Sequence, residues 1–245
     1  MANANDTLRY EWVLAGLVAA AGRFVPLPFV HGILRSRAER WVVRRTAVAS
    51  GLGHHDLDPL WGGDLGAALV RKLLRAPLRL LLFPVRRIAA ILSSARGVPR
   101  DAVRPVLLGR AVSIAVDLGQ LTPAQAPEER RERARELREA FDRVYRNTDL
   151  HLLRAALADM MTRMPDLRVA VHARALELLG RELPPETMDC DSEATIDEVT
   201  GTLGGGELDA FFAAFDRELG ELLVAGVATA PEPTRSAGAE AAAAS

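Results

Sequence analysis

The stretch EERRERARELREAFDRVYR, residues 128–146, decides the fold class of this sequence. Its apolar residues Ala134, Leu137, Phe141 and Val144 recur at intervals of three and four residues among charged neighbours. This spacing is the 3.6-residue period of an amphipathic α-helix that buries one stripe. The segment therefore predicts a helix with one face packed on a core and the other in water.

Further helical patterns follow on both sides of this segment. We predict helices at about 7–23, 29–50, 102–118, 149–164, 165–180 and 207–225, with loops at 51–63 and 118–129 and an acidic, irregular stretch at 181–199. No run of alternating β-branched residues is long enough for a sheet. After residue 229 there are too few large apolar residues to fold, which predicts a disordered C-terminal tail. The fold class predicted is all-α, a multi-helix bundle.

The charge of the chain is divided between its two halves. The overall charge is −1, but residues 1–127 hold 17 Arg and Lys against 8 Asp and Glu, whereas the remainder holds 14 against 24. We therefore predict a basic helical half at 1–120 with a Pro-x-Pro helical hairpin, an acidic bundle half at 121–228 and the tail at 229–245. A split of this kind indicates a basic surface that meets an anionic partner. The alternative is that the halves neutralise each other within one domain.

The most basic segment is GAALVRKLLRAPLRLLLFPVRRIAAILS, residues 66–93, with six cations and no acid. At 100° per residue its cations share one half of a helical wheel, while most of its leucines, including Leu73, Leu80 and Leu81, fill the other. Pro77 and Pro84 kink the region. We predict that an anionic surface is bound by Arg71, Lys72, Arg75, Arg79, Arg86 and Arg87, followed by Arg40, Arg44 and Arg45 of the preceding helix.

Three interpretations of this basic face are open. A basic amphipathic helix is typical of a protein that lies on an anionic membrane or binds an acidic protein partner. Phosphate contacts with nucleic acid need only the charge, but no recognition helix, zinc module or RNA-binding signature accompanies it. The third interpretation is a core helix of a soluble helical protein with a cationic outer face.

The N-terminal region does not predict a membrane span. Its two longest stretches without charge, 12–22 and 24–34, are separated by Arg23 and interrupted by Pro26 and Pro28. A span needs about 20 apolar residues. A shallow hairpin inserted at 12–34 is the alternative. With one cysteine and no secretory signal pattern, we expect a cytoplasmic protein, with the inner face of the cytoplasmic membrane as its second location.

The motifs that would carry chemistry are incomplete. His54, His55, Asp56 and Asp58 lack the spacing of metal ligands. The acidic run 189–193 lacks the glycine and the final glutamate of a calcium loop, and Cys190 lies among carboxylates that disfavour a thiolate. The glycine-rich stretch 201–207 is not a phosphate-binding loop. We therefore predict a non-enzymatic protein with no metal and no cofactor.

Residues 13–51, which join two helices through Pro26-x-Pro28 and end in spaced arginines and Gly51, resemble known bacterial families. They are similar to the helical hairpin of an inner-membrane family of unknown function that accompanies small GTPases, and to EcsC-type proteins. The resemblance implies a membrane-linked helical protein and supplies no catalytic residue. The thirty arginines against one lysine, in a chain rich in alanine, also favour a bacterial origin.

Overall fold

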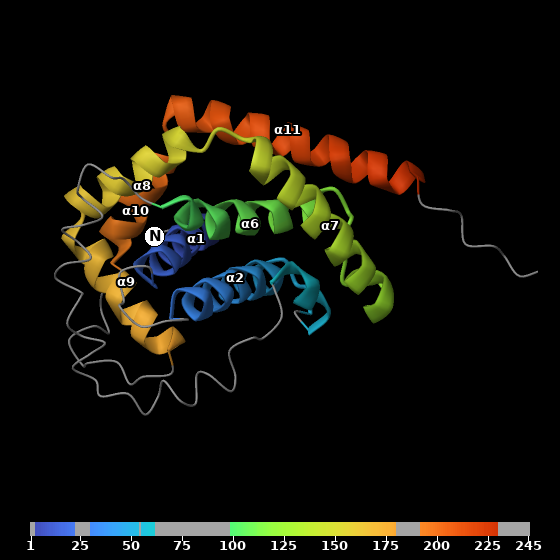
Figure 1. The fold of residues 1–245 in the computed structure, drawn as a ribbon, viewed down its shortest axis with the longest axis horizontal. Coiled ribbons are helices and arrows are strands. Elements are labelled where there is room, and N and C mark those ends of the chain that lie inside the picture. The colour runs from blue at the N-terminus through green and yellow to red at the C-terminus, as the bar shows by residue number, and fades with distance from the viewer. Residues whose placement is uncertain (1–2, 23–29, 54, 62–98, 180–191, 230–245) are drawn as a thin grey trace, which may run out of the picture.

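The computed structural model describes residues 3–22, 30–53, 55–61, 99–179 and 192–229 (Figure 1). Every regular element in these ranges is a helix, which confirms the predicted all-α, multi-helix fold. The basic region 66–93, which is predicted to be kinked, and the tail beyond residue 229 lie outside these ranges. The elements are α1 (Ala4–Ala21), α2 (Val30–Ala49), the 3₁₀-helix η2 (His55–Leu60), α6 (Arg100–Asp117), α7 (Pro127–Asn147), α8 (His151–Arg163), α9 (Pro165–Leu178), α10 (Glu193–Leu203) and α11 (Gly206–Thr229).

Helix α1 forms the centre of the molecule. All of its residues from Trp12 to Ala21 are buried, as expected for a helix that is apolar on every side. It packs against α2, α6, α9 and α10. In Figure 1, α11 lies above α6 and α2 lies below α6. Helices α8, α9 and α10 gather at one end of the molecule. Residues from both sides of position 120 belong to the one hydrophobic core cluster around α1.

Two glycines permit the close packing of α1 on α6. A Cβ atom on Gly16 of α1 would lie 2.1 Å from the carbonyl oxygen of Ala102 in α6. A Cβ atom on Gly109 of α6 would lie 2.5 Å from the indole nitrogen of Trp12. The same nitrogen donates a hydrogen bond to Thr46 Oγ1 of α2 at 2.9 Å, so Trp12 fixes all three helices together.

Helix α7 confirms the prediction made from residues 128–146. Its predicted stripe, Ala134, Leu137, Phe141 and Val144, is at most 1% exposed. The Phe141 ring packs edge-on against Phe215 of α11, with centroids 6.4 Å apart. The stripe therefore packs against α11 as well as against the core.

The prediction of irregular structure at 181–199 is wrong from residue 193 onward, where α10 begins. Ser192 caps this helix by accepting a hydrogen bond from the Thr195 backbone nitrogen at 3.3 Å. Ile196, Val199 and Leu203 then repeat at helical spacing and are buried. Because the segment is acidic, it was predicted to be irregular, although it contains a short helix. The Ser192 cap and the buried stripe stabilise that helix. The predicted loop at 51–63 likewise contains η2.

No helix within the described ranges combines the length and the apolar character needed to cross a bilayer.

We predict that Gly16→Ala destabilises the protein by about 1–3 kcal/mol, because the added methyl group meets backbone and cannot be accommodated by a rotamer change. Gly201→Ala in α10 is the matched control, since its Cβ atom would meet nothing within 4 Å. That variant should be neutral or stabilised by up to about 1 kcal/mol. Urea unfolding measures both, and equal effects of the two substitutions would contradict the packing described for α1 and α6.

Candidate anion-binding site

The structure describes three of the nine cations predicted to bind an anionic surface. Arg40, Arg44 and Arg45 lie on α2. The other predicted binding residues, and the apolar residues Leu73, Leu80 and Leu81, lie outside the described residues: Arg71, Lys72, Arg75, Arg79, Arg86 and Arg87.

Arg40 and Arg44 line a groove of about 360 Å³ at the surface of α2, which we call the α2 groove. Its walls come from α2, from the residue after η2 and from the end of α9. Arg37, which the sequence analysis did not select, lies beside them. The lining residues are Ser36, Arg37, Arg40, Trp41, Arg44, Trp61, Glu177 and Leu178.

The sequence of α2 places these arginines together. Positions 37, 40 and 44 are separated by three and four residues, so they fall within about 60° of one another on a helical wheel. The same helix buries Leu34, Ala38 and Val42 against the core. The groove arginines therefore share one side of α2, away from that buried stripe.

Two of the groove side chains contact neutral groups of the fold. Arg37 donates a hydrogen bond from Nη1 to the backbone oxygen of Leu178 at the end of α9. The Arg40 guanidinium lies over the Trp61 ring, 5.5 Å from its centroid. The Leu178 carbonyl carries no full negative charge, so this contact leaves the positive charge of Arg37 in place.

Arg44, like Arg40, is a groove residue with an unsatisfied donor. Its Nε atom is buried and makes no hydrogen bond, and the described residues offer its guanidinium no carboxylate. Buried guanidinium groups are ordinarily hydrogen-bonded, because an unsatisfied buried donor costs about 1–3 kcal/mol. An anion in the groove would satisfy that donor.

The acid at the rim of the groove is already engaged. Arg174 forms an ion pair with Glu177 and also lies over the Trp41 ring, 4.7 Å from its centroid. Within the lining itself, three arginines against one glutamate give a formal charge of +2. The groove therefore favours an anionic ligand.

Arg45 lies outside this groove. It donates from Nε to Glu11 of α1 at 2.8 Å and from Nη2 to the second oxygen of the same carboxylate at 2.7 Å. The hydrogen bond that Arg45 donates to Glu11 raises the pKa of Arg45 above its ordinary value. Its charge is used within the fold, unlike that of its neighbour Arg44.

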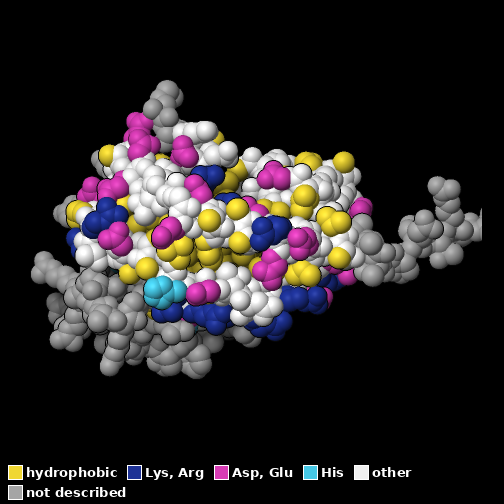
Figure 2. Space-filling model, turned by 90° about the horizontal axis from the view of Figure 1, so that it is seen from above, with side chains coloured by type: hydrophobic (Ala, Val, Ile, Leu, Met, Phe, Trp, Pro, Cys, Tyr) yellow, Lys and Arg dark blue, Asp and Glu magenta, His cyan; other side chains and the backbone are white. Residues whose placement is uncertain are grey.

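Other charges are paired within the fold, between residues of the two halves. Arg110 of α6 binds both carboxylate oxygens of Asp216 in α11 at 2.6 Å, and Arg130 of α7 reaches back to Asp56 at 2.9 Å. Seen from the side of α11, the described surface shows acidic and basic side chains interspersed with apolar ones (Figure 2). Part of the charge division between the halves is therefore neutralised within one fold.

A second cluster of charges lies between α2, α6 and α7 and is fully paired. Glu39, 2% exposed, accepts a hydrogen bond from Arg104 at 3.1 Å, and Arg138 lies 3.7 Å away. Asp142 pairs with both arginines, at 2.6 Å and 3.0 Å. Burial alone would raise the pKa of Asp142, but Arg104 and Arg138 together outweigh burial and lower that pKa. Because each of its carboxylates is paired with arginines, this cluster is a structural connection between the three helices.

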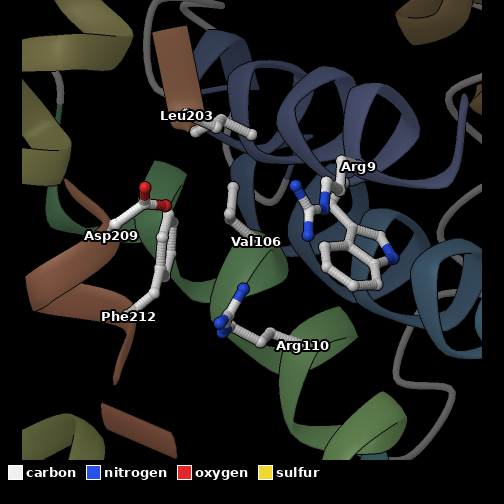
Figure 3. A pocket seen from close by; sticks show the side chains of 7 residues that line it. Arg9, Val106, Arg110, Leu203, Asp209 and Phe212 are labelled. Atoms are coloured by element: carbon white, nitrogen blue, oxygen red, sulfur yellow. The ribbon is translucent and has the colours of Figure 1, made fainter. Parts of the chain in front are cut away.

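A small hollow between α1, α6 and α11 is the other candidate (Figure 3). Arg9 and Arg110 reach it from α1 and α6, and Asp209 and Phe212 from α11. It measures about 50 Å³ and adjoins a hollow of about 210 Å³. Together they are lined by two arginines and three aspartates, so an anion is not favoured there: Arg9, Arg110, Asp117, Asp209 and Asp216.

The acids near His55 serve as ion-pair partners. Asp56 binds Arg130, and Asp58 lies 3.3 Å from Arg131. No group of three metal-competent side chains occurs in the described part of the chain. The candidate residues His54, Asp189, Cys190 and Asp191 lie outside that part. Among the described histidines, His31 pairs with Asp101 at 3.2 Å, and burial lowers the pKa of His172.

The groove residues Arg37, Trp41 and Trp61 were missed by the sequence analysis. The three-and-four spacing of the α2 arginines was a signal that could have added Arg37. No local signal could have added Trp61, because it reaches the groove only through the fold. Comparisons with family models, curated proteins and solved structures give no match to this chain.

Tyr145, which contacts the second charge cluster, provides a test of burial at this site. Its hydroxyl donates to the Arg100 backbone oxygen at 2.8 Å, and burial raises its pKa to about 12. An unfolded tyrosine ionises at about 10. Ionisation therefore favours the unfolded chain between these values, so the free energy of unfolding should fall as pH rises from 10 to 12.

The Tyr145→Phe variant should lack this component, because it has no hydroxyl to ionise. We expect the gap in unfolding free energy between wild type and variant to change by about 2–3 kcal/mol across that range. Urea unfolding at several pH values measures the gap. Parallel pH curves for the two proteins would show that Tyr145 titrates normally.

Proposed function

We propose that this protein is a non-catalytic binding protein that docks on an anionic membrane surface through the α2 groove. The single observation that carries the proposal is Arg44, a partly buried arginine in a cationic groove with no acceptor among the described residues. The proposed location is the inner face of a bacterial cytoplasmic membrane, as the resemblance of residues 13–51 implies.

The composition of the groove supports a membrane partner. Each Arg near an anionic leaflet contributes about 1 kcal/mol, so Arg37 and Arg44 give about 2 kcal/mol, or roughly thirtyfold in partitioning. Tryptophan is enriched at membrane interfaces, where its ring contacts apolar groups and its N–H stays in polar surroundings. Trp41 and Trp61 stand beside the arginines in the groove. The basic segment 66–93 would add to this attraction in the proposed mode of docking.

We predict that the full chain co-sediments with vesicles that contain anionic lipid at low salt and is released at high salt, because charge dominates the attraction. The double variant Arg37→Gln/Arg44→Gln should lose about 2 kcal/mol, or roughly thirtyfold in partitioning.

The matched control is Arg143→Gln/Arg217→Gln, which removes two exposed arginines outside the groove and changes the net charge equally. Sedimentation of this control should exceed that of the groove variant. An equal loss in both double variants would assign binding to net charge alone, and no sedimentation of the wild type at low salt would refute membrane docking. Binding of DNA or RNA with a steep salt dependence, in place of vesicles, would favour the nucleic-acid alternative.

A further inference from the structure

A cleft lies between α1, α6 and α11, where the two hollows described above share Arg9, Trp12 and Arg110 in their walls (Figure 3). We call it the α6 cleft. Its smaller hollow measures about 50 Å³ and its larger hollow about 210 Å³. Drug-sized ligands fill pockets of roughly 300–1,000 Å³, so the α6 cleft has room for a smaller molecule.

One ion pair in the wall of the α6 cleft is closed within the fold. Arg110 binds both carboxylate oxygens of Asp216 at 2.6 Å, and its guanidinium group lies 4.5 Å from the centroid of the Phe212 ring. The charges of Arg110 and Asp216 therefore cancel each other. This pair connects α6 to α11 and so positions the two walls of the cleft.

Three other charged residues of the cleft have no ion-pair partner among the described residues: Arg9 of α1, Asp117 of α6 and Asp209 of α11. All three are exposed, and Figure 3 places Arg9 and Asp209 on opposite sides of the smaller hollow. One positive charge against two negative charges leaves a net charge of −1 on these groups. A complementary ligand has a net positive charge and also carries an anionic group for Arg9.

The order of these charges along the cleft narrows the choice of ligand. Asp209 lines the smaller hollow, Arg9 lines both hollows, and Asp117 lines the larger one. Along α6, Asp117 lies about 10 Å of helix rise beyond Arg110. The order is therefore negative, positive, negative. A ligand that matches it carries an ammonium group, a carboxylate and a second cation, which is the arrangement of a basic α-amino acid.

The size and the walls of the two hollows assign the two ends of such a ligand. The smaller hollow suits a compact group, which is the α-ammonium beside Asp209. The larger hollow has Leu8 and Ile114 in its wall, and both pack against the hydrophobic core. Apolar surface of this kind suits the methylene stem of a long basic side chain, whose charged end then reaches Asp117.

We infer that the α6 cleft binds a free basic amino acid of the lysine or arginine class. Arg9 contacts its carboxylate, Asp209 its α-ammonium group and Asp117 its side-chain cation. This inference goes beyond the proposed membrane docking and does not depend on it, because the α6 cleft and the α2 groove share no residue.

Calorimetric titration of the full chain with L-lysine and three analogues tests each contact by itself. Cadaverine lacks the carboxylate, norleucine lacks the side-chain ammonium group, and Nα-acetyl-lysine lacks the α-ammonium group. Lysine should bind saturably. Each analogue should bind roughly tenfold more weakly, because it loses one hydrogen-bonded charge at an exposed site.

Three variants remove the matching groups of the protein: Arg9→Gln, Asp117→Asn and Asp209→Asn. Each should weaken lysine binding roughly tenfold, but should not weaken binding of the analogue that lacks its partner group. Arg9→Gln, for example, should affect lysine and not cadaverine. The matched controls Arg143→Gln and Asp197→Asn change the same charges at exposed positions outside the cleft, and they should bind lysine as the wild type does. Circular dichroism melts show whether each variant is folded.

No saturable binding of lysine or arginine to the wild type would overturn this inference. Binding of cadaverine as tightly as lysine would assign the cleft to diamines and overturn the amino acid as its ligand. An equal loss in the cleft variants and in the controls would trace binding to net charge and overturn the cleft as the site. Each of these results leaves the proposed docking through the α2 groove intact.

Discussion

The rest of the structure depends on the close contact between α1 and α6. With Gly16 against the Ala102 carbonyl, α1 lies so near α6 that no side chain separates them. Trp12 then packs on Gly109 and donates to Thr46, which places α2 against the same pair. Once α2 is fixed along its Leu34, Ala38 and Val42 stripe, the side that carries Arg37, Arg40 and Arg44 is fixed as well. The position of the candidate site thus follows from helix packing in the core.

Charges in the fold divide into those that join helices and those that remain available. Between α2, α6 and α7, the carboxylates of Glu39 and Asp142 pair with Arg104 and Arg138. Asp216 of α11 pairs with Arg110 of α6. Partly buried pairs of this kind fix geometry more than they add net stability, because desolvation offsets the attraction. The α2 groove differs, because Arg37 meets a neutral carbonyl and Arg44 has no acceptor among the described residues. This difference is the basis for proposing the groove as the docking site of an external anion.

The helical architecture could be predicted from the sequence because its signals are local. The stripe in residues 128–146 required only the spacing of apolar residues, and it is buried as expected. Helix α10 was missed because its acidic, threonine-rich composition outweighed a three-residue apolar stripe. The cap from Ser192 that stabilises it is a single hydrogen bond, which composition does not reveal.

The site could be predicted only in part, because a tertiary contact decides which arginine is available. Arg44 and Arg45 are adjacent and look equivalent in the sequence, yet Glu11 of α1 captures Arg45 and leaves Arg44 in the groove. Trp61 and Leu178 come from distant parts of the chain, so their presence beside Arg40 and Arg37 has no local signature. The prediction for the cations at 71–87 concerns residues outside the described ranges and stays a prediction.

A crystal structure of the full chain grown with glycerol 3-phosphate tests the central claim most directly. The account predicts a phosphate group in the α2 groove, with oxygens about 2.7–2.9 Å from guanidinium nitrogens of Arg37 and Arg44, including Arg44 Nε. An empty groove at saturating ligand, or a carboxylate of the chain itself on Arg44, would contradict it.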